Sequence, residues 1–209
     1  MTTILHIAAS PVAAASRTRT AARHLIDAYL RRHPEATVDT MDVWWLDLPH
    51  FDADMVAAKF AVLRSSEATA QQRALWERAA ALARRFNAAD RYVFSVPMWN
   101  FGLPYRLKHF IDIVTLPGEN WRWSRERGYE GLLHGKRAAV VYSSAGAHPL
   151  QVDPAGPDHQ KGQMRAWLAF LGITDVQEIN VAPTLAEPLA VERTMAQARR
   201  EAQRLAAVL

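Results

Sequence analysis

Residues 92–101 read YVFSVPMWNF, a run that is apolar apart from one serine until it stops at a proline. Such a run is typical of a strand buried on both faces, and Pro97, which has no N–H to pair, predicts its end. Beyond it, Met98, Trp99 and Phe101 supply apolar surface, while Asn100 supplies both a donor and an acceptor. The loop therefore suits the polar edge of a flat heteroaromatic ring such as an isoalloxazine. The alternative is an ordinary strand-to-helix loop whose aromatic side chains close the core.

Four further short segments predict strands, at residues 3–9, 36–41, 137–142 and 173–181. The segments between the strands have helical spacing. Thr69 and Gln72 form a capping box that predicts a helix start, Pro104 predicts a first helical residue, and Gly172 predicts a helix end. Strands that are apolar throughout and alternate with amphipathic helices indicate a parallel sheet covered on both faces. We therefore expect a single α/β domain over residues 1–209, a flavodoxin-like doubly wound sheet of five parallel strands with helices on both faces.

The composition narrows the classes of function. The chain lacks cysteine, and its eight histidines lack the H-x-x-x-H and H-E-x-x-H spacings, so we expect no metal site. The net charge of +4 is spread over helix faces without an aromatic-interleaved basic run, so we expect no nucleic-acid partner. The sequence contains no run of about 18 apolar residues and no export signal, so we expect a cytoplasmic protein with no membrane partner.

The loop after the first strand suits a phosphate, because ligands of doubly wound sheets bind beyond the carboxyl ends of the strands. Ser10 is followed by Ser16, Arg17 and Thr18 at the start of the first helix. Hydroxyl groups, free N–H groups and the helix dipole favour an anion there. The absence of G-x-G-x-x-G and G-x-x-x-x-G-K-[ST] argues against a Rossmann site and a P-loop. The alternative is that Ser16 only caps the helix.

The loop after the fourth strand consists of small residues, which let backbone approach a flat ligand. Its members are Ser143, Ser144, Ala145 and Gly146. The two serines add hydroxyl groups, although a plain turn would explain the segment equally well. His148 follows and could orient an electron-rich substrate oxygen. Together the three loops place a phosphate site, a ring platform and a second ring edge on one rim of the sheet, which favours FMN.

On these residues the chain resembles the FMN-dependent NADH:quinone oxidoreductases, also called FMN-dependent NADH-azoreductases, from about Thr3 to the last helix. Ser10 and residues 16–18 match that family's phosphate loop, and residues 97–101 match its P-M-[YW]-N-F signature. Further matches are Lys108, Asp112, residues 128–132 and residues 172–175. Relatives often carry S-R-G-G where this chain reads SSAG at residues 143–146, so an arginine and a glycine are missing beside the pyrimidine edge.

The resemblance implies an FMN-dependent NAD(P)H oxidoreductase that reduces quinones, and also azo compounds, by two-electron ping-pong transfer. We expect no obligatory catalytic side chain, because the flavin itself carries the chemistry. The resemblance also implies a homodimer with two sites at the subunit interface. Trp121 and Trp123 stand in the segment that covers the flavin in such enzymes, so we expect them, with His148, to contact substrate.

Two other functions stay open at the level of sequence. One is a noncatalytic flavodoxin-like FMN electron carrier, against which the basic pI of about 9.7 argues, because such carriers are usually strongly acidic. The other is a flavin-free binding module that has kept the fold. The sequence leaves open the physiological acceptor, the preference for NADH or NADPH, the importance of azo reduction, and the effect of Ser144 and Ala145 on the flavin potential.

Overall fold

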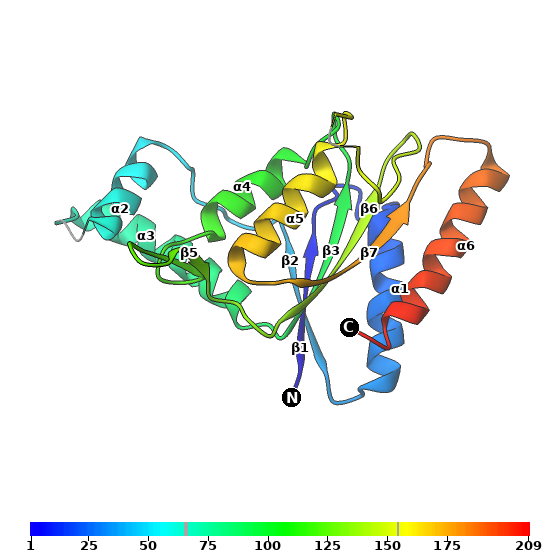
Figure 1. The fold of residues 1–209 in the computed structure, drawn as a ribbon, viewed down its shortest axis with the longest axis horizontal. Coiled ribbons are helices and arrows are strands. Elements are labelled where there is room, and N and C mark those ends of the chain that lie inside the picture. The colour runs from blue at the N-terminus through cyan, green and yellow to red at the C-terminus, as the bar shows by residue number, and fades with distance from the viewer. Residues whose placement is uncertain (65–66, 154) are drawn as a thin grey trace.

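The computed structural model describes residues 1–64, 67–153 and 155–209. Figure 1 shows a central sheet with helices on both sides. The elements are β1 Thr3–Ala8, α1 Arg17–Arg32, β2 Thr37–Asp42, α2 Ala53–Leu63, α3 Ala70–Asn87, β3 Arg91–Pro97, α4 Tyr105–Val114, β4 Trp121–Ser124, β5 Gly128–Gly131, β6 Arg137–Ser143, α5 His159–Leu171, β7 Asp175–Val181 and α6 Pro188–Leu205. Five strands form a parallel sheet in the order β2-β1-β3-β6-β7, which confirms the predicted flavodoxin-like architecture.

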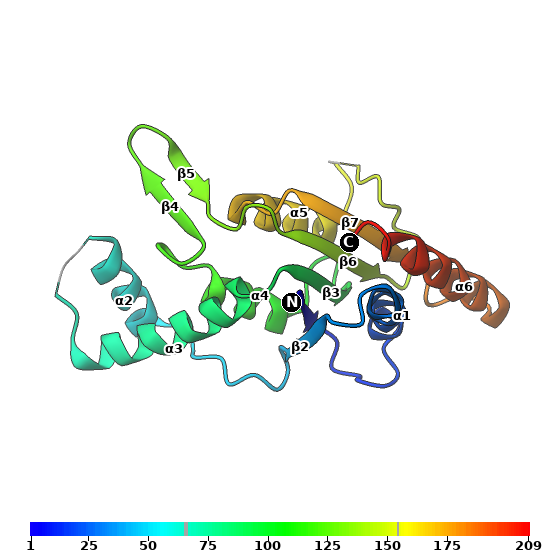
Figure 2. The same ribbon diagram turned by 90° about the horizontal axis from the view of Figure 1, so that it is seen from below.

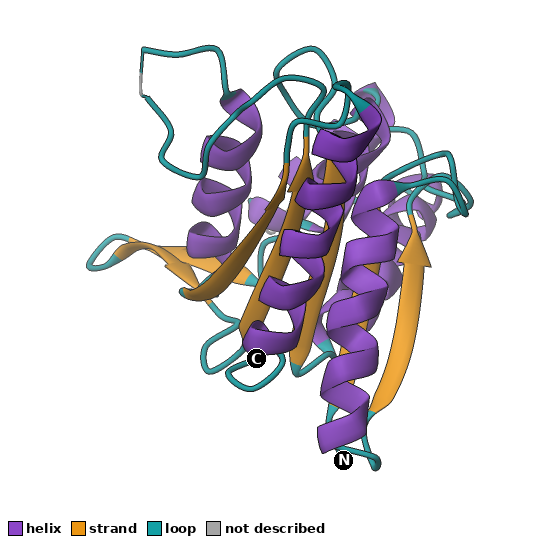
Figure 3. Cartoon of the chain, turned by 90° about the vertical axis from the view of Figure 1, so that its right-hand side faces the viewer, coloured by secondary structure: helices purple, strands orange, loops and turns teal. Residues whose placement is uncertain are grey.

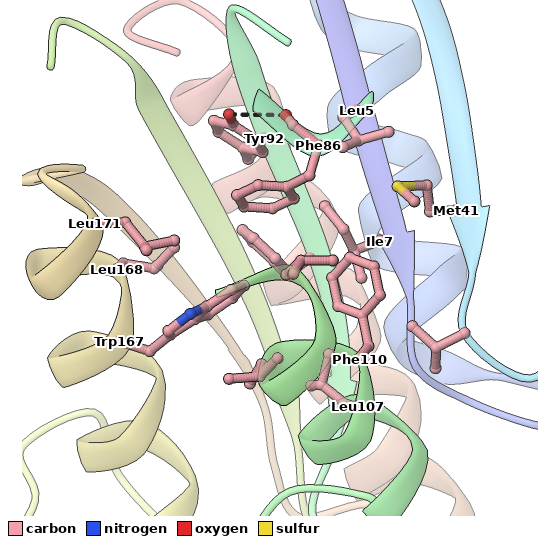
Figure 4. Packing of buried hydrophobic residues seen from close by; sticks show 14 of the residues in the cluster. Leu5, Ile7, Met41, Phe86, Tyr92, Leu107, Phe110, Trp167, Leu168 and Leu171 are labelled. Atoms are coloured by element: carbon pink, nitrogen blue, oxygen red, sulfur yellow. Dashed lines mark hydrogen bonds between the residues drawn. The ribbon is translucent and has the colours of Figure 1, made fainter. Parts of the chain in front are cut away.

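The core lies on both faces of this sheet. α1 and α6 run side by side over one face, as Figure 3 shows, and bury the smaller apolar cluster. α3, α4 and α5 cover the other face, where Phe86, Tyr92, Phe110 and Trp167 pack together (Figure 4). The Tyr92 hydroxyl donates to the Phe86 carbonyl at 3.0 Å. This packing fixes the carboxyl ends of β1, β3 and β6 side by side. Together with the loops that follow these strands, they form one edge of the sheet, the rim.

The two edge strands differ from the predicted strands that are apolar throughout. β2 reads TVDTMD and buries only Met41, and β7 buries only Ile179 and Val181. Each edge strand pairs on one side only, so it tolerates polar residues that a central strand does not. β7 also begins at Asp175 rather than at Ile173, because the Ile173 N–H still donates to a carbonyl of α5.

Several expected helix ends are confirmed, and three elements were not predicted. The Thr69–Gln72 capping box is present, and Gly172 ends α5 in the left-handed conformation. Pro104 is the N-cap of α4 rather than its first residue. α2 and the hairpin of β4 and β5 are additional, and Figure 2 shows the hairpin standing out from the body. Within the described residues, none of the helices has the length and apolarity that crossing a bilayer requires.

Candidate functional site

The start of α1 brings hydroxyl groups and N–H groups together. Ser16 is the N-cap, and its Oγ accepts from the Arg19 N–H at 3.3 Å and lies 3.0 Å from Thr18 Oγ1. Both hydroxyl-bearing side chains are buried. The capping role of Ser16 is therefore real, but it is compatible with an anion site, because the N–H groups of Arg17 and Thr18 have no partner within the helix.

Arg19 ties this helix start to the ends of two strands. Its guanidinium donates to the carbonyl of the buried Ser10 and pairs with Asp42 at 2.7 Å. The Arg17 side chain is exposed at the helix start. Because Asp42 offsets the charge of Arg19, the exposed Arg17 is the cation that favours a phosphate at this helix start.

The loop after β3 is a tight turn with an unusual backbone. Trp99 and Gly102 pair through two backbone hydrogen bonds of 3.0 and 2.9 Å. Between them, Asn100 has φ 45° and Phe101 has φ 68°. Asparagine tolerates the left-handed region, whereas phenylalanine is strained there by about 1–3 kcal/mol. Such strain persists only where neighbouring structure imposes it, and it is typical of functional loops.

Two backbone hydrogen bonds from other elements hold that turn. β3 runs through Pro97, one residue beyond the expected end at Val96, and the next N–H, that of Met98, donates to the Ser143 carbonyl at 2.7 Å. The His159 N–H at the start of α5 donates to the Phe101 carbonyl at 2.9 Å. The turn is thus clamped by β6 on one side and by α5 on the other.

An aromatic cluster joins this turn to the loops after β1 and β2. The Trp44 ring lies 5.5 Å from Trp99 and 5.3 Å from Tyr105, between centroids. Trp44 Nε1 donates to the Ala9 carbonyl at 3.0 Å. Trp99 and Phe101 keep 38% and 52% of their surface exposed, so aromatic faces stay open at the rim. Sequence alone could not assign Trp44 to this site, because an aromatic residue after a strand serves a core equally well.

The loop after β6 uses its hydroxyl groups differently from the expectation. Ser143 and Ser144 are buried. Ser144 Oγ donates to the Gly146 carbonyl at 2.8 Å, and the Ser144 carbonyl accepts from the Thr184 N–H at 2.9 Å. The Ser144 hydroxyl therefore shapes the loop, and the exposed Ala145 and Gly146 present its backbone at the rim.

His148 is brought to the ring platform. Its ring centroid lies 6.4 Å from that of Phe101, and its Nδ1 lies 3.8 Å from Asp158 Oδ2. The His148 side chain is 20% exposed. The structure thus brings the predicted loops and His148 to one rim.

The first turn of α5 buries three polar side chains that the sequence analysis missed. Asp158 is the N-cap and accepts from the N–H groups of Gln160 and Lys161 at 3.1 and 3.2 Å. Lys161 is fully buried and pairs with the Asp158 carboxylate. Gln160, also fully buried, donates to the Val96 carbonyl at 3.0 Å. Burial acts to raise the pKa of Asp158, but the hydrogen bonds and charge of Lys161 outweigh it, so this pKa lies below its usual range.

His6 lies beneath the loops and is neutral at pH 7. Its Nε2 is 3.0 Å from Ser95 Oγ. Burial, followed by the charge of Arg19, lowers the pKa of His6 to about 4. Within the described part of the chain, no group of three or more His, Asp and Glu side chains is arranged to hold a metal ion.

Within one chain, Trp121 and Trp123 do not lie at this rim. Trp121 is 7% exposed and packs against Tyr129 and Phe170 with centroids 5.5 and 5.6 Å apart. Trp123 is 60% exposed on the hairpin. The hairpin meets the C-terminal end of α5, whereas the loops meet its N-terminal end, about 18 Å away for a helix of this length.

The geometry fits a ligand with a phosphate, a polar tail and a flat ring with a polar edge. The start of α1 offers an anion site, and the turn Trp99–Gly102 offers aromatic faces and one amide. Ala145 and Gly146 allow close approach of a ring edge. The donor set at this rim therefore fits FMN.

Comparisons with known proteins identify the fold and the family of the chain. The family model described as flavodoxin-like fold matches residues 2–206. An FMN-dependent NADH:quinone oxidoreductase of Desulfotalea psychrophila is 38% identical over 206 residues, covering 99% of this chain and 97% of the relative. FMN-dependent NADH:quinone oxidoreductase 2 of Pseudomonas syringae pv. tomato is 39% identical and covers 99% and 98%.

Solved structures show the same fold. An azoreductase from Bacillus anthracis superposes with a TM-score of 0.88 at 23% identity and covers 100% of both chains. An FMN-dependent NADH-azoreductase from the same species, in complex with FMN, superposes with a TM-score of 0.84 at 24% identity, covering 99% of this chain and 100% of the other.

Proposed function

The chain belongs to the flavodoxin-like fold family, among its FMN-dependent NADH:quinone oxidoreductases, and from this membership we propose how its residues serve the reaction. The protein is an enzyme that depends on FMN and takes electrons from NADH. The observation that carries the proposal is the convergence of three loops at one rim, around the strained turn at Asn100 and Phe101. One FMN-binding domain spans residues 1–209.

Three groups of residues would hold the cofactor. Ser16 and Thr18, whose hydroxyl oxygens lie 3.0 Å apart, would donate to the phosphate, and Arg17 would add positive charge. Ser10 shapes the loop behind them through its carbonyl, which accepts from Arg19. The platform for the ring would consist of Pro97, Met98, Trp99, Asn100 and Phe101. The Asn100 amide would hydrogen-bond the polar edge of the ring. A second edge of the ring would lie along the backbone of Ser143, Ser144, Ala145 and Gly146.

Bound FMN supplies the two-electron chemistry, so no protein side chain is an obligatory catalyst. The residues at the rim bind and orient the reactants. The exposed aromatic faces of Trp99 and Phe101 would exclude water from the flat flavin ring at little entropic cost. His148, beside Phe101, donates a hydrogen bond to an electron-rich oxygen of a flat acceptor. Quinones, and azo compounds of similar flatness, are the acceptors that such a surface fits.

The nicotinamide and the acceptor use the same face of the rim in turn. This follows from the single cluster of loops and from the sequence, which has no second nucleotide-binding motif. Alternate occupancy requires a ping-pong reaction. An electron carrier is the weaker candidate, because the relatives are named as oxidoreductases and the pI is about 9.7.

The working form is a homodimer in the cytoplasm, where NADH is available. Apolar side chains stay exposed on α2 and the loop before it, among them Trp45, Phe60 and Leu63. A second copy would cover them. In such a pair, the exposed Trp123 of one protomer would reach the site of its partner, while Trp121 packs the hairpin.

Steady-state kinetics test this function. The purified protein, loaded with FMN, should oxidise NADH with a benzoquinone as acceptor and give parallel double-reciprocal lines. Intersecting lines together with a ternary complex would reject the shared site. A protein that binds FMN but shows no quinone turnover would be an electron carrier instead.

A further inference from the structure

The loop between β7 and α6 holds the backbone of the loop after β6. The Thr184 N–H donates to the Ser144 carbonyl at 2.9 Å, and the Thr184 hydroxyl donates to the same carbonyl at 2.9 Å. The Ala145 carbonyl accepts from the N–H groups of Thr184 and Leu185, both at 3.2 Å. Two successive carbonyl groups are therefore turned toward the loop after β7, mainly by one residue, Thr184.

The carbonyl groups on either side of this pair are also occupied. The Ser143 carbonyl accepts from the Met98 N–H at 2.7 Å, and the Gly146 carbonyl accepts from Ser144 Oγ at 2.8 Å. A carbonyl oxygen has two lone pairs, and the Ser144 and Ala145 carbonyls each accept two hydrogen bonds already. The backbone of residues 143–146 is therefore poor in acceptors for a ligand.

The N–H groups of the same peptide units point the other way. In a trans peptide unit the C=O and the N–H lie on opposite sides, so the N–H groups of Ala145 and Gly146 point away from Thr184. Because β6 lies between β7 and β3 in the sheet, these N–H groups face the side of β3 and the turn Trp99–Gly102. Ala145 and Gly146 are exposed, and over residues 1–64, 67–153 and 155–209 neither N–H has a hydrogen-bond partner. The loop thus presents two successive donors to the rim.

Resting on the function proposed above, we propose that Thr184 is a positioning residue, which turns the Ser144 and Ala145 carbonyls away from the cofactor so that the loop after β6 offers only donors and favours reduced over oxidised FMN. Successive backbone N–H groups that face one side bind an anion or an acceptor oxygen. A carbonyl turned to that side would repel the same oxygen. Thr184 acts through the backbone of the loop.

The redox state of the flavin decides how strongly such donors bind it. Hydride transfer from NADH brings two electrons and one proton, so it leaves one negative charge on the ring, at the pyrimidine edge that carries acceptor atoms. A hydrogen bond to a charged acceptor is stronger than one to a neutral acceptor. Residues 143–146 include no cationic side chain, so the backbone donors are what this loop can contribute. They should therefore raise the midpoint potential of bound FMN.

The test measures the midpoint potential of bound FMN in Thr184→Val, a change that removes the hydroxyl and keeps the size of the side chain. The FMN-loaded protein is equilibrated with a reference dye under anaerobic conditions, without quinone. Reduced FMN should lose about fivefold in affinity relative to oxidised FMN, the effect of roughly one hydrogen bond. For a two-electron couple this ratio lowers the midpoint potential by about 20 mV. Thr184→Ser keeps the hydroxyl and should restore the wild-type potential, whereas Ser144→Ala, which frees the Gly146 carbonyl, should also lower it.

Thr115→Val is the matched control. The Thr115 hydroxyl also donates to a backbone carbonyl, that of Ile111 at 2.6 Å, but it does so at the end of α4 that lies away from the turn Trp99–Gly102. It accepts from Trp167 Nε1 at 2.9 Å as well, so its loss should lower the melting temperature at least as much as Thr184→Val does. The potential of bound FMN should stay unchanged in this control. An equal shift of potential in both variants would indicate a loosened fold and would refute a positioning role.

Amide NMR tests the direction of the two donors. The N–H signals of Ala145 and Gly146 should shift when FMN is added, and both N–H groups should exchange with solvent more slowly than in the apoprotein. Unchanged signals of both residues, or a wild-type potential in Thr184→Val, would overturn the proposal. Neither measurement uses a quinone, so an FMN-loaded protein without quinone turnover would contradict the proposed function while these two results still decide the inference.

Discussion

Replacing Ser16 and Thr18 together by alanine should weaken FMN binding and leave riboflavin binding nearly unchanged. The two hydroxyl oxygens lie 3.0 Å apart at the start of α1, so one phosphate group can accept from both. Hydrogen bonds to a charged group contribute about 1 to 3 kcal/mol for the pair, after competition from water is included. The dissociation constant for FMN should therefore rise about 5- to 150-fold.

The same change also costs stability, and this cost must be separated from binding. Ser16 Oγ accepts from the Arg19 N–H, so the variant loses a helix cap worth about 1 kcal/mol. Thr69→Ala is the matched control, since Thr69 caps α3 in the same way, with Oγ1 accepting from the Gln72 N–H at 3.1 Å. It should lower the unfolding free energy by a similar amount and leave FMN affinity unchanged.

Titration of the apoprotein with FMN and with riboflavin, followed by quenching of flavin fluorescence, measures both affinities. The wild-type protein should prefer FMN strongly, and the Ser16/Thr18 double variant should lose most of that preference. If the ratio of the two affinities stays the same, the phosphate lies elsewhere and Ser16 is only a cap.

Three further predictions concern the turn, the buried histidine and the hairpin. Asn100→Gly keeps a residue suited to φ 45° and removes only the side-chain amide, so FMN affinity should fall without loss of thermal stability. The control Arg200→Ala, on the exposed face of α6, should change neither quantity. Unchanged FMN affinity and turnover in Asn100→Gly would make the turn purely structural. Burial lowers the pKa of His6 from 6.5 to about 4. Between pH 6.5 and pH 4 the unfolded chain therefore binds a proton at His6 that the folded chain does not. The free energy of unfolding should fall as the pH falls through this range, by up to about 3 kcal/mol. In urea titrations across this window, His6→Gln should show a smaller loss, and an identical slope would contradict the assignment. Trp123→Ala should raise the KM for benzoquinone in the dimer, whereas Trp121→Ala should chiefly lower the melting temperature, and the reverse pattern would refute these roles.

The central sheet could be predicted because its inner strands are apolar throughout and its loops carry helix-start signals. α2 could not, because its apolar residues do not form one stripe, and Val56, Phe60 and Leu63 remain exposed. The hairpin consists of two four-residue strands, too short for a pattern of alternation to stand out. Local periodicity thus predicts the elements that pack on the sheet and misses those that stand away from it.

Sequence identifies those residues of the candidate site whose chemical type the proposed function requires. It does not identify residues whose role depends on a contact that forms only in the folded chain. Hydroxyl groups at a helix start and an asparagine after a buried strand are visible in sequence. A fully buried lysine is not, because lysine is almost always exposed. Asp158 lies only three residues before Lys161, but the fold alone brings His148 to that carboxylate. The left-handed Phe101 was equally hidden, since phenylalanine rarely adopts that conformation.

The most direct test of the central claim separates the two halves of the reaction in time. The FMN-loaded protein is mixed with one equivalent of NADH under anaerobic conditions in a stopped-flow instrument, and a benzoquinone is added after the nucleotide has been removed. We predict that the flavin absorbance bleaches in the first step and returns fully in the second, at rates no slower than steady-state turnover. Recovery that requires NADH to be present together with the quinone would contradict a shared site used in turn.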